Sequence, residues 1–364
     1  MAKRVLIIGG YGNFGSYIAR RLAKEADLQI IIAGRNLDKA TKLAEDIGAE
    51  AVNLDIHHDL ATHLTQIKPD IVIHTSGPFQ EQDYHVAKCC INAGCHYIDL
   101  ADGRNFVANI TSLNDAAMKK GVSVISGASS VPCLTSALVD AYKDQFSSIE
   151  NLDYGITTAQ KTNRGLATTA AILGYTGKSF ETIINGHPHK VYGWQNLHWR
   201  KYKTLGWRLL GNCDIPDLAL FTARYPSLKT IRFYAGLEIP LLHIGLWGLS
   251  WLVRIGSIKN LSRIAPFMLK ASYWFDAFGS ADSGFHMVIS GQGHNNQPKE
   301  ICFELTARDG DGPYIPCMPA ILLTQKLARG DLNMNGAQPC LGLISKDEYL
   351  GALSSLNISW YDNA

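Results

Sequence analysis

A glycine-rich segment near the start of the chain constrains its fold more than any other feature. Gly10-Tyr11-Gly12-Asn13-Phe14-Gly15 follows the apolar run Val5–Ile8, and Phe14, Ile18 and Leu22 then recur at helical spacing. A strand, a turn rich in glycine and a helix, in this order, are typical of a βαβ unit that holds a dinucleotide. The segment therefore predicts a parallel sheet that starts with this unit.

The following residues continue the alternation of strand and helix patterns. Short β-branched runs are separated by segments in which apolar residues recur every three or four positions. This pattern predicts an α/β doubly wound (Rossmann) domain over residues 1–130. Its expected strands are Val5–Ile8, Gln29–Ala33, Ala51–Leu54, Asp70–His74, His96–Leu100 and Val122–Ser126.

The pattern changes beyond this domain. Phe285–Ser290 and Ile301–Thr306 alternate in side-chain type and predict an antiparallel hairpin. We therefore expect an α+β substrate or dimerisation domain over 145–312. In 313–364 we expect a helix that ends at Gly330 and another that begins at a capping box of Ser345 and Glu348. These C-terminal helices are expected to pack on the first domain.

Composition excludes several classes of protein. The net charge of +2 indicates no nucleic-acid partner. The eight cysteines include no CxxC pair, so we predict no metal site and a reduced, cytoplasmic environment. A strand that starts directly after Arg4 leads us to expect no signal peptide. A small-molecule substrate and a homo-oligomer are expected.

Each glycine of the turn has a mechanical role in nucleotide binding. Gly10 permits the tight turn, Gly12 lets the backbone approach a pyrophosphate, and Gly15 lets the helix lie against the strand. The amides and dipole at the helix N-terminus then favour the phosphates. The motif predicts a pyridine-nucleotide cofactor and therefore an oxidoreductase.

The end of the second strand indicates which nucleotide is bound. Arg35 stands twenty residues after Gly15, where NAD enzymes usually place a carboxylate for the ribose 2′-hydroxyl. A guanidinium pairs with a 2′-phosphate, and Asn36 and Lys39 add donors, so NADP is favoured over NAD. Asp55, after the third strand, is a candidate for the adenine amino group or a simple turn residue.

Two loops are expected at the nicotinamide end of the cofactor. Ser76, Gly77, Pro78 and Phe79 follow the fourth strand, with Phe79 covering the nicotinamide ring. Asp99 ends the fifth strand and is expected to point toward the same crevice between the domains. It is our candidate for the group that handles the proton.

Other motifs offer competing interpretations. Tyr84 and Lys88 match the YxxxK of short-chain dehydrogenases, but on an earlier helix than that role requires. Cys133 begins a helix, where a thiolate would be favoured, or it is a small buried residue. His187 and His189 flank a proline and indicate a loop near the substrate rather than a metal site.

Ile239–Val253 carries no formal charge and contains two tryptophans. It is shorter than the roughly 20 residues that span a bilayer. The segment therefore predicts a buried helix, a dimer contact or a peripheral, interfacial membrane helix. The last of these allows an alternative function, a membrane-peripheral nucleotide-binding sensor or scaffold without turnover, and a membrane-associated location.

Five motifs carry a resemblance to a known family: GGYGNFG, AGRN, TSGPF, HYIDLAD and GASSVPCLTSALVD. In this order they resemble the saccharopine dehydrogenase-like oxidoreductases, best over residues 4–142. The resemblance implies hydride transfer to or from a small carbonyl or imine (C–N), or a lipid-like enoyl substrate. Ser129 and Ser130 stand where relatives often carry Asp-Ser, which removes an acid. We expect these serines and Trp194 to contact the substrate.

Overall fold

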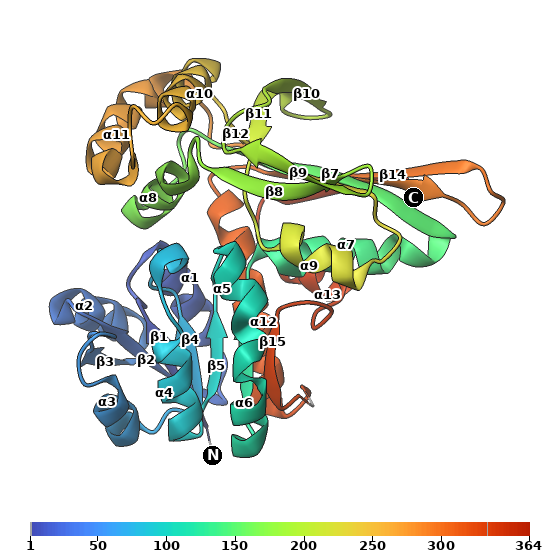
Figure 1. The fold of residues 1–364 in the computed structure, drawn as a ribbon. Coiled ribbons are helices and arrows are strands. Elements are labelled where there is room, and N and C mark those ends of the chain that lie inside the picture. The colour runs from blue at the N-terminus through green and yellow to red at the C-terminus, as the bar shows by residue number, and fades with distance from the viewer. Residues whose placement is uncertain (1, 333) are drawn as a thin grey trace. The chain divides into compact units, whose positions relative to one another are not determined.

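The computed structural model describes residues 2–332 and 334–364, which divide into two compact units. Unit 1 comprises Met1–Ala137 and Tyr314–Ala352, and unit 2 comprises Leu138–Pro313 and Leu353–Ala364. The chain therefore returns to unit 1 after building most of unit 2, and then supplies a last strand to unit 2 (Figure 1).

Unit 1 contains a parallel sheet in the order β15-β6-β5-β4-β1-β2-β3. All six predicted strands are present, with small shifts at their ends, and a seventh strand from the C-terminal region pairs with β6. From β1 the strand order runs to one edge through β2 and β3 and to the other edge through β4, β5 and β6. The point between β1 and β4, where the order reverses, is the position at which such sheets bind ligands. The strands are β1 (Lys3–Ile8), β2 (Leu28–Gly34), β3 (Glu50–Asn53), β4 (Ile71–His74), β5 (His96–Asp99), β6 (Ser123–Ser126) and β15 (Gly336–Pro339).

Helices form two groups around this sheet (Figure 1). Helix α1 contacts α2 and α12, while α4 contacts α3 and α6. The β-branched strands lie between the groups, and Leu6, Val72 and Val124 are fully buried. The helices are α1 (Asn13–Leu22), α2 (Leu37–Ile47), α3 (Leu60–Ile67), α4 (His85–Ala93), α5 (Arg104–Ala108), α6 (Asn114–Lys120), α12 (Met318–Arg329) and α13 (Lys346–Ala352).

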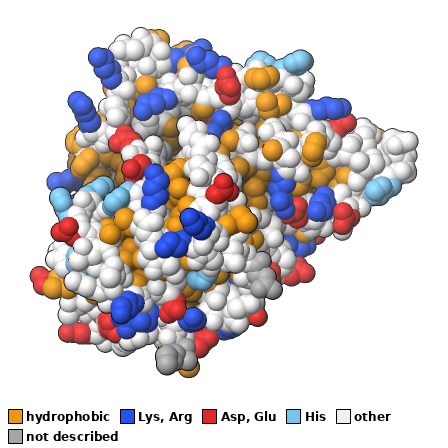
Figure 2. Space-filling model, turned by 60° about the horizontal axis from the view of Figure 1, so that its bottom comes forward, with side chains coloured by type: hydrophobic (Ala, Val, Ile, Leu, Met, Phe, Trp, Pro, Cys, Tyr) orange, Lys and Arg blue, Asp and Glu red, His pale blue; other side chains and the backbone are white. Residues whose placement is uncertain are grey.

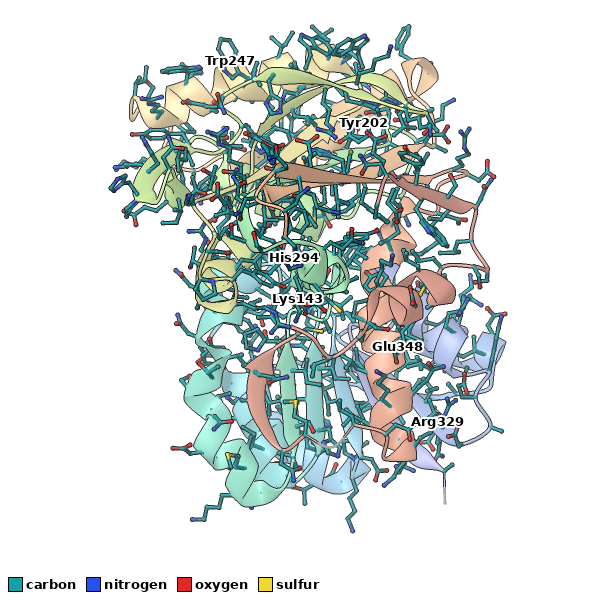
Figure 3. All side chains as sticks on the ribbon, turned by 90° about the vertical axis from the view of Figure 1, so that its right-hand side faces the viewer. Lys143, Tyr202, Trp247, His294, Arg329 and Glu348 are labelled. Carbon is teal, nitrogen blue, oxygen red and sulfur yellow. The ribbon has the colours of Figure 1, made fainter. Side chains whose placement is uncertain are left out.

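Two C-terminal helices of unit 1 match the sequence-based expectations. Helix α12 ends at Gly330, which adopts φ +76°, and contacts β4 and β5. In the capping box before α13, the Ser345 amide donates to Glu348 at 2.8 Å and the Glu348 amide donates to Ser345 Oγ at 3.2 Å. Glu348, labelled in Figure 3, also pairs with Lys326 at 2.7 Å.

Unit 2 is built on a mixed sheet in the order β10-β11-β12-β7-β13-β14-β16. The predicted hairpin is its β13–β14 pair, in which Ile289 faces Ile301. A separate two-stranded sheet consists of β8 and β9. The strands are β7 (Ser148–Thr158), β8 (Ser179–Ile184), β9 (His187–Tyr192), β10 (His198–Tyr202), β11 (Gly206–Asn212), β12 (Thr230–Leu237), β13 (Ser283–Gln292), β14 (Pro298–Ala307) and β16 (Ile358–Asp362).

Helices of unit 2 lie against this sheet or beside one another. Helix α7 (Thr135–Tyr142) runs from unit 1 into unit 2, and Tyr142 donates to Asp362 of β16 at 2.5 Å. Strand β16 pairs with β14, so the last residues do not accompany the C-terminal helices, contrary to expectation. The remaining helices are α8 (Leu166–Tyr175), α9 (Asp217–Arg224), α10 (Pro240–Arg254) and α11 (Ala265–Ser272).

The uncharged segment Ile239–Val253 forms most of α10. His243, Leu246 and Ser250 bury one face of the helix, whereas Leu241 is 65% exposed on another. The helix is therefore half buried, with one face in the core of unit 2 and another exposed. Among the described residues, no helix is long and apolar enough to cross a membrane.

Candidate nucleotide-binding site

The turn after β1 is shaped by glycines at points where a side chain would not fit. A Cβ on Gly15 would lie 2.4 Å from the Gly9 carbonyl oxygen, and a Cβ on Gly12 would lie 3.1 Å from the same atom. Helix α1 therefore packs directly on the turn, as predicted for Gly15. Gly9 adopts a left-handed conformation in this turn, with φ +77°, and a Cβ on Gly10 would lie 2.9 Å from the Ile7 carbonyl oxygen.

Helix α1 begins at this turn without a side-chain cap. Gly12 is its N-cap residue, and its first turn contains no acidic residue. Further along α1, Ile18 and Leu22 are fully buried in the core. A helix N-terminus with free backbone amides, preceded by glycines that let a ligand come close to the backbone, is the arrangement that binds a pyrophosphate. The residues present fit this group.

Tyr11 connects the glycine turn to the end of β2. Its hydroxyl accepts a hydrogen bond from the Asn36 amide at 3.1 Å, and its ring crosses Gly34, where a Cβ would lie 2.5 Å from a ring carbon. Asn36 caps α2 by accepting from the Lys39 amide at 2.9 Å. Arg35 and Lys39 are exposed beside this contact. Four of the predicted nucleotide-binding residues thus lie together.

Asp55 follows β3 and accepts a hydrogen bond from the His57 amide at 3.0 Å. This bond lowers the pKa of its carboxyl group. The structure therefore provides direct support for its interpretation as a turn residue. The contact engages Oδ1, so it does not decide the role proposed for Asp55 at the adenine.

The loop after β4 is tied to the glycine turn by Thr75, which sequence reasoning missed. Thr75 Oγ1 donates to the carbonyl oxygens of Ile8 at 2.9 Å and Gly9 at 3.2 Å. The Ser76 carbonyl accepts from Gln82 at 2.7 Å, and a cis peptide bond joins Gly77 to Pro78. The backbone at Ser76 is thereby held beside Gly9.

Phe79 does not point out of this loop. Its ring is 4% exposed and packs 5.0 Å from the His74 ring and 5.4 Å from the Phe106 ring, measured between centroids. The expectation that Phe79 covers the nicotinamide is therefore corrected: the ring belongs to the core. Burial of the ring and its contacts with neighbouring aromatic rings stabilise this position.

Asp99 is also buried and supports the next loop. Its Oδ1 accepts from the amides of Ala101 at 2.9 Å and Gly127 at 2.8 Å and from Ser126 Oγ at 3.0 Å. Burial raises the pKa of its carboxyl group to about 6. A fully buried carboxylate with these donors positions the loop after β6, which corrects the expectation that it points into an open crevice.

His74 and Tyr97 form a second buried polar contact beside Asp99. His74 Nδ1 lies 3.0 Å from Tyr97 Oη, and burial lowers the pKa of His74 to about 3. The imidazole is therefore neutral, and one ring nitrogen can accept from the tyrosine. No sequence motif marks this pair, because its residues come from adjacent strands and meet only in the sheet.

The predicted substrate residues fall in different units. Ser129 is largely buried and follows Gly127, which has φ +74°, while Ser130 is partly exposed. Trp194 belongs to unit 2, where it is 1% exposed and stacks on Tyr175 with 6.4 Å between ring centroids. Trp194 is therefore a core residue of its unit, which corrects its expected place on an open pocket.

The competing motifs find structural explanations. The Tyr84 hydroxyl donates to the Phe106 carbonyl at 2.6 Å, and burial raises its pKa to about 12, opposite to what proton transfer requires. Burial raises the pKa of the Cys133 thiol, which opposes a thiolate.

His187 and His189 lie exposed on strand β9 rather than in a loop. The part of the chain that the structure describes contains no cluster suited to a metal ion.

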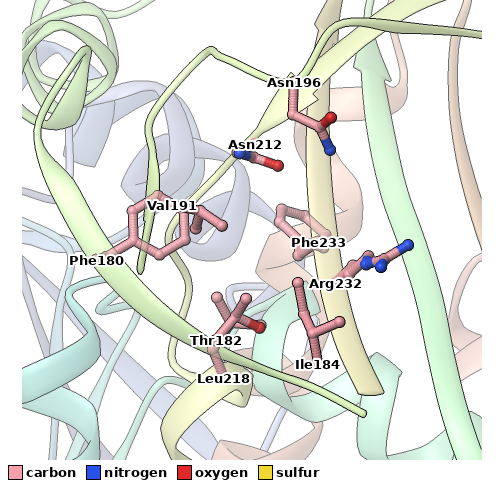
Figure 4. Close-up of a pocket in the computed structure, with 9 residues that line it drawn as sticks. All are labelled: Phe180, Thr182, Ile184, Val191, Asn196, Asn212, Leu218, Arg232 and Phe233. Atoms are coloured by element: carbon pink, nitrogen blue, oxygen red, sulfur yellow. The ribbon is translucent and has the colours of Figure 1, made fainter. Parts of the chain in front are cut away.

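A small pocket lies in unit 2 between the β8–β9 hairpin and strands β11 and β12 (Figure 4). The space open to water is about 20 Å³, enough for about one molecule. This pocket is therefore too small for an organic substrate. Its lining residues are Phe180, Thr182, Ile184, Val191, Asn196, Asn212, Leu218, Arg232 and Phe233.

These features define unit 1 as a Rossmann domain of the pyridine-nucleotide-binding class, and its glycine turn is the candidate site. Residues 5–132 match the family model described as saccharopine dehydrogenase NADP binding domain, which confirms the resemblance noted from the motifs. No curated protein matches the sequence. Figure 2 shows basic and acidic side chains interspersed over the visible face, as expected for a net charge of +2.

Two solved structures share the fold over the length of the chain. An apo saccharopine dehydrogenase (L-Glu forming) from Saccharomyces cerevisiae is 13% identical, with full coverage of both chains and a TM-score of 0.70. A homospermidine synthase from Legionella pneumophila in complex with NAD is 12% identical, covers 99% of this chain and 91% of its own, and has a TM-score of 0.61. At these identities the likeness describes the fold.

Proposed function

We propose that the chain is an NADP-dependent oxidoreductase that transfers a hydride to or from a small carbonyl or imine carbon, or an enoyl double bond. The observation that carries the proposal is the turn after β1, where Gly9 and Gly15 leave no room for a side chain and the N-terminus of α1 has no side-chain cap. The NADP-binding family of residues 5–132 supports the same cofactor. When bound, the nicotinamide supplies or accepts the hydride.

The choice of NADP rests on the group around Tyr11. Arg35 and Lys39 are exposed and form no ion pair among the described residues, so both are available to a 2′-phosphate. Because the Tyr11 hydroxyl accepts from Asn36, its own proton remains to be donated. Asp38, in the first turn of α2, and Asp55, whose carboxyl group interacts with the charge of Arg35, are the opposing charges.

An imine is the first substrate class to test. Saccharopine reductases, which the motifs resemble, act on a C–N bond. The two solved structures are named as a saccharopine dehydrogenase and a homospermidine synthase. Ser129 and Ser130 follow β6, at the same carboxyl edge as the glycine turn, and are proposed to contact the substrate. We assign no acid or base, because Asp99 is buried.

The experiment is NADPH oxidation by the full chain with two substrate sets. One set combines 2-oxo acids with amines, and the other contains enoyl thioesters. Turnover with the first set, reduced in a Ser130→Ala variant that binds NADPH normally, supports the proposal. Turnover only with the second set assigns the enoyl class. Nucleotide binding without turnover in either favours the sensor or scaffold alternative.

A further inference from the structure

Helix α10 exposes an apolar stripe along its length. Leu241, Ile244, Trp251, Leu252 and Ile255 are between 39% and 67% exposed. Their spacing places them on one side of a helix, opposite the buried His243, Leu246 and Ser250. The stripe contains no charged residue until Arg254, at the end of the helix. A row of this length is unusual on the surface of a monomer and indicates an interaction site.

The next elements expose a second stripe that is richer in aromatic rings. It runs through the short helices η5 (Ser262–Ile264) and η6 (Tyr273–Phe278) on either side of α11. Phe267, Trp274 and Phe278 are 68%, 75% and 79% exposed, and Ile264 and Tyr273 exceed one third. Figure 1 shows α10 and α11 at the same end of unit 2. We call these exposed side chains of residues 241–278 the α10–η6 surface.

The unpaired charges of this surface have one sign. Lys259, Arg263 and Lys270 are exposed and form no ion pair among the residues that the structure describes. The acid of the segment is Asp276, which accepts from Arg164 at 2.6 Å and Gln160 at 2.9 Å. The α10–η6 surface therefore combines exposed apolar side chains with cations that no acid neutralises.

This charge pattern selects among the occupants of such a surface. A second copy on a two-fold axis would bring both sets of these three cations into one interface with no acid to offset them. An anionic lipid surface instead offers phosphates to the cations and an acyl boundary to the apolar side chains. Tryptophan and tyrosine are favoured at that boundary, and Trp251, Tyr273 and Trp274 are exposed on this surface.

We propose that the α10–η6 surface docks on membranes that carry anionic headgroups. Because α10 has 15 residues, fewer than the roughly 20 that span a bilayer, the helix lies in the plane of the interface. The proposal uses unit 2 alone and is independent of the cofactor and the reaction proposed above. It refines the interpretation of Ile239–Val253 by adding the aromatic stripe and the cations after it.

The test is flotation of the full chain with vesicles of phosphatidylcholine, with and without phosphatidylglycerol. We expect binding to the vesicles with phosphatidylglycerol and release at high salt. The double variant Leu252→Glu, Trp274→Glu should float at background level. The matched control is Trp207→Glu on β11, which is 60% exposed outside the surface and should bind as the parent does.

A second variant tests the cations of the surface and leaves its apolar side chains unchanged. Replacement of Lys259, Arg263 and Lys270 by glutamine leaves the fold unaffected, since these side chains are exposed, and should weaken vesicle binding by about tenfold or more. Failure of the parent to bind anionic vesicles overturns the proposal. Equal binding by the parent and both variants overturns it too, as does a dimer in sedimentation that Trp274→Glu dissociates, which would assign the surface to a second copy.

Discussion

Asp99 accepts a hydrogen bond from the backbone amide of Gly127 at 2.8 Å, which joins the end of β5 to the loop after β6. Ala101 and Ser126 donate to the same oxygen. Asp99→Ala leaves these buried donors without an acceptor, so we expect it to lower the free energy of unfolding by about 3 kcal/mol or more. Urea unfolding measures this loss. Asp99→Asn keeps an oxygen there and should lose less; an equal loss would contradict the role of the oxygen.

The same carboxyl group predicts a pH dependence. Its pKa is about 6 in the folded chain and 3.8 ordinarily, so the folded state holds the proton more tightly. The contribution of Asp99 to the free energy of unfolding is therefore most favourable below pH 3.8. It declines as the pH rises toward 6, by about 3 kcal/mol in total. The difference in unfolding free energy between parent and Asp99→Asn should follow this course. A difference that does not change across this range would show that the pKa is not raised.

Gly15 should tolerate no side chain. In Gly15→Ala the new Cβ would lie 2.4 Å from the Gly9 carbonyl oxygen, so α1 must move away from the turn. We expect NADPH binding to weaken by at least about tenfold and the melting temperature to fall. Gly351→Ala is the matched control, because Gly351 lies in α13 with open space around it. It should bind normally and gain up to about 1 kcal/mol of stability.

Cysteine labelling tests whether Cys133 is a nucleophile. Cys133 is buried and its thiol pKa is raised, so iodoacetamide should not modify it in the native chain. Cys89 and Cys302 are partly exposed and should react first. Peptide mass spectrometry identifies the modified sites. Rapid, NADPH-sensitive labelling of Cys133 would restore the covalent mechanism.

The capping box offers a test of a feature predicted from sequence. Ser345→Ala removes the acceptor for the Glu348 amide and should cost about 1 kcal/mol of stability. Ser345→Asp retains an acceptor and should remain close to the parent. Thermal unfolding measures both variants, and an unchanged Ser345→Ala would show that water replaces the cap.

Features predicted well from sequence are those set by local chemistry. The glycine turn, the β-branched strands of unit 1 and the capping box at Ser345 depend on neighbouring residues, and each is present in the structure. The hairpin around Ile289 and Ile301 was also predictable, because alternation along each strand sets which side chains face the core.

Features that depend on partners distant in sequence were predicted poorly. Phe79 follows β4 and Asp99 ends β5, at the edge where ligands bind. The Phe79 ring packs on Phe106 of α5. Asp99 accepts from Ala101 just after β5 and from Ser126 and Gly127 at the end of β6. Both side chains therefore turn inward. Thr75 was missed for the same reason. Its acceptors, the carbonyl groups of Ile8 and Gly9, lie at the end of the neighbouring strand β1 and are distant in sequence.

The most direct test of the proposed NADP site is competition between two nucleotide fragments, measured by calorimetry on the full chain. The parent should bind 2′,5′-ADP more tightly than 5′-AMP, and Arg35→Asp should reverse that order. Lys42→Asp, the same charge change at another exposed position of α2, should leave the order unchanged. If the parent binds 5′-AMP as tightly as 2′,5′-ADP, the assignment of NADP to this site is wrong.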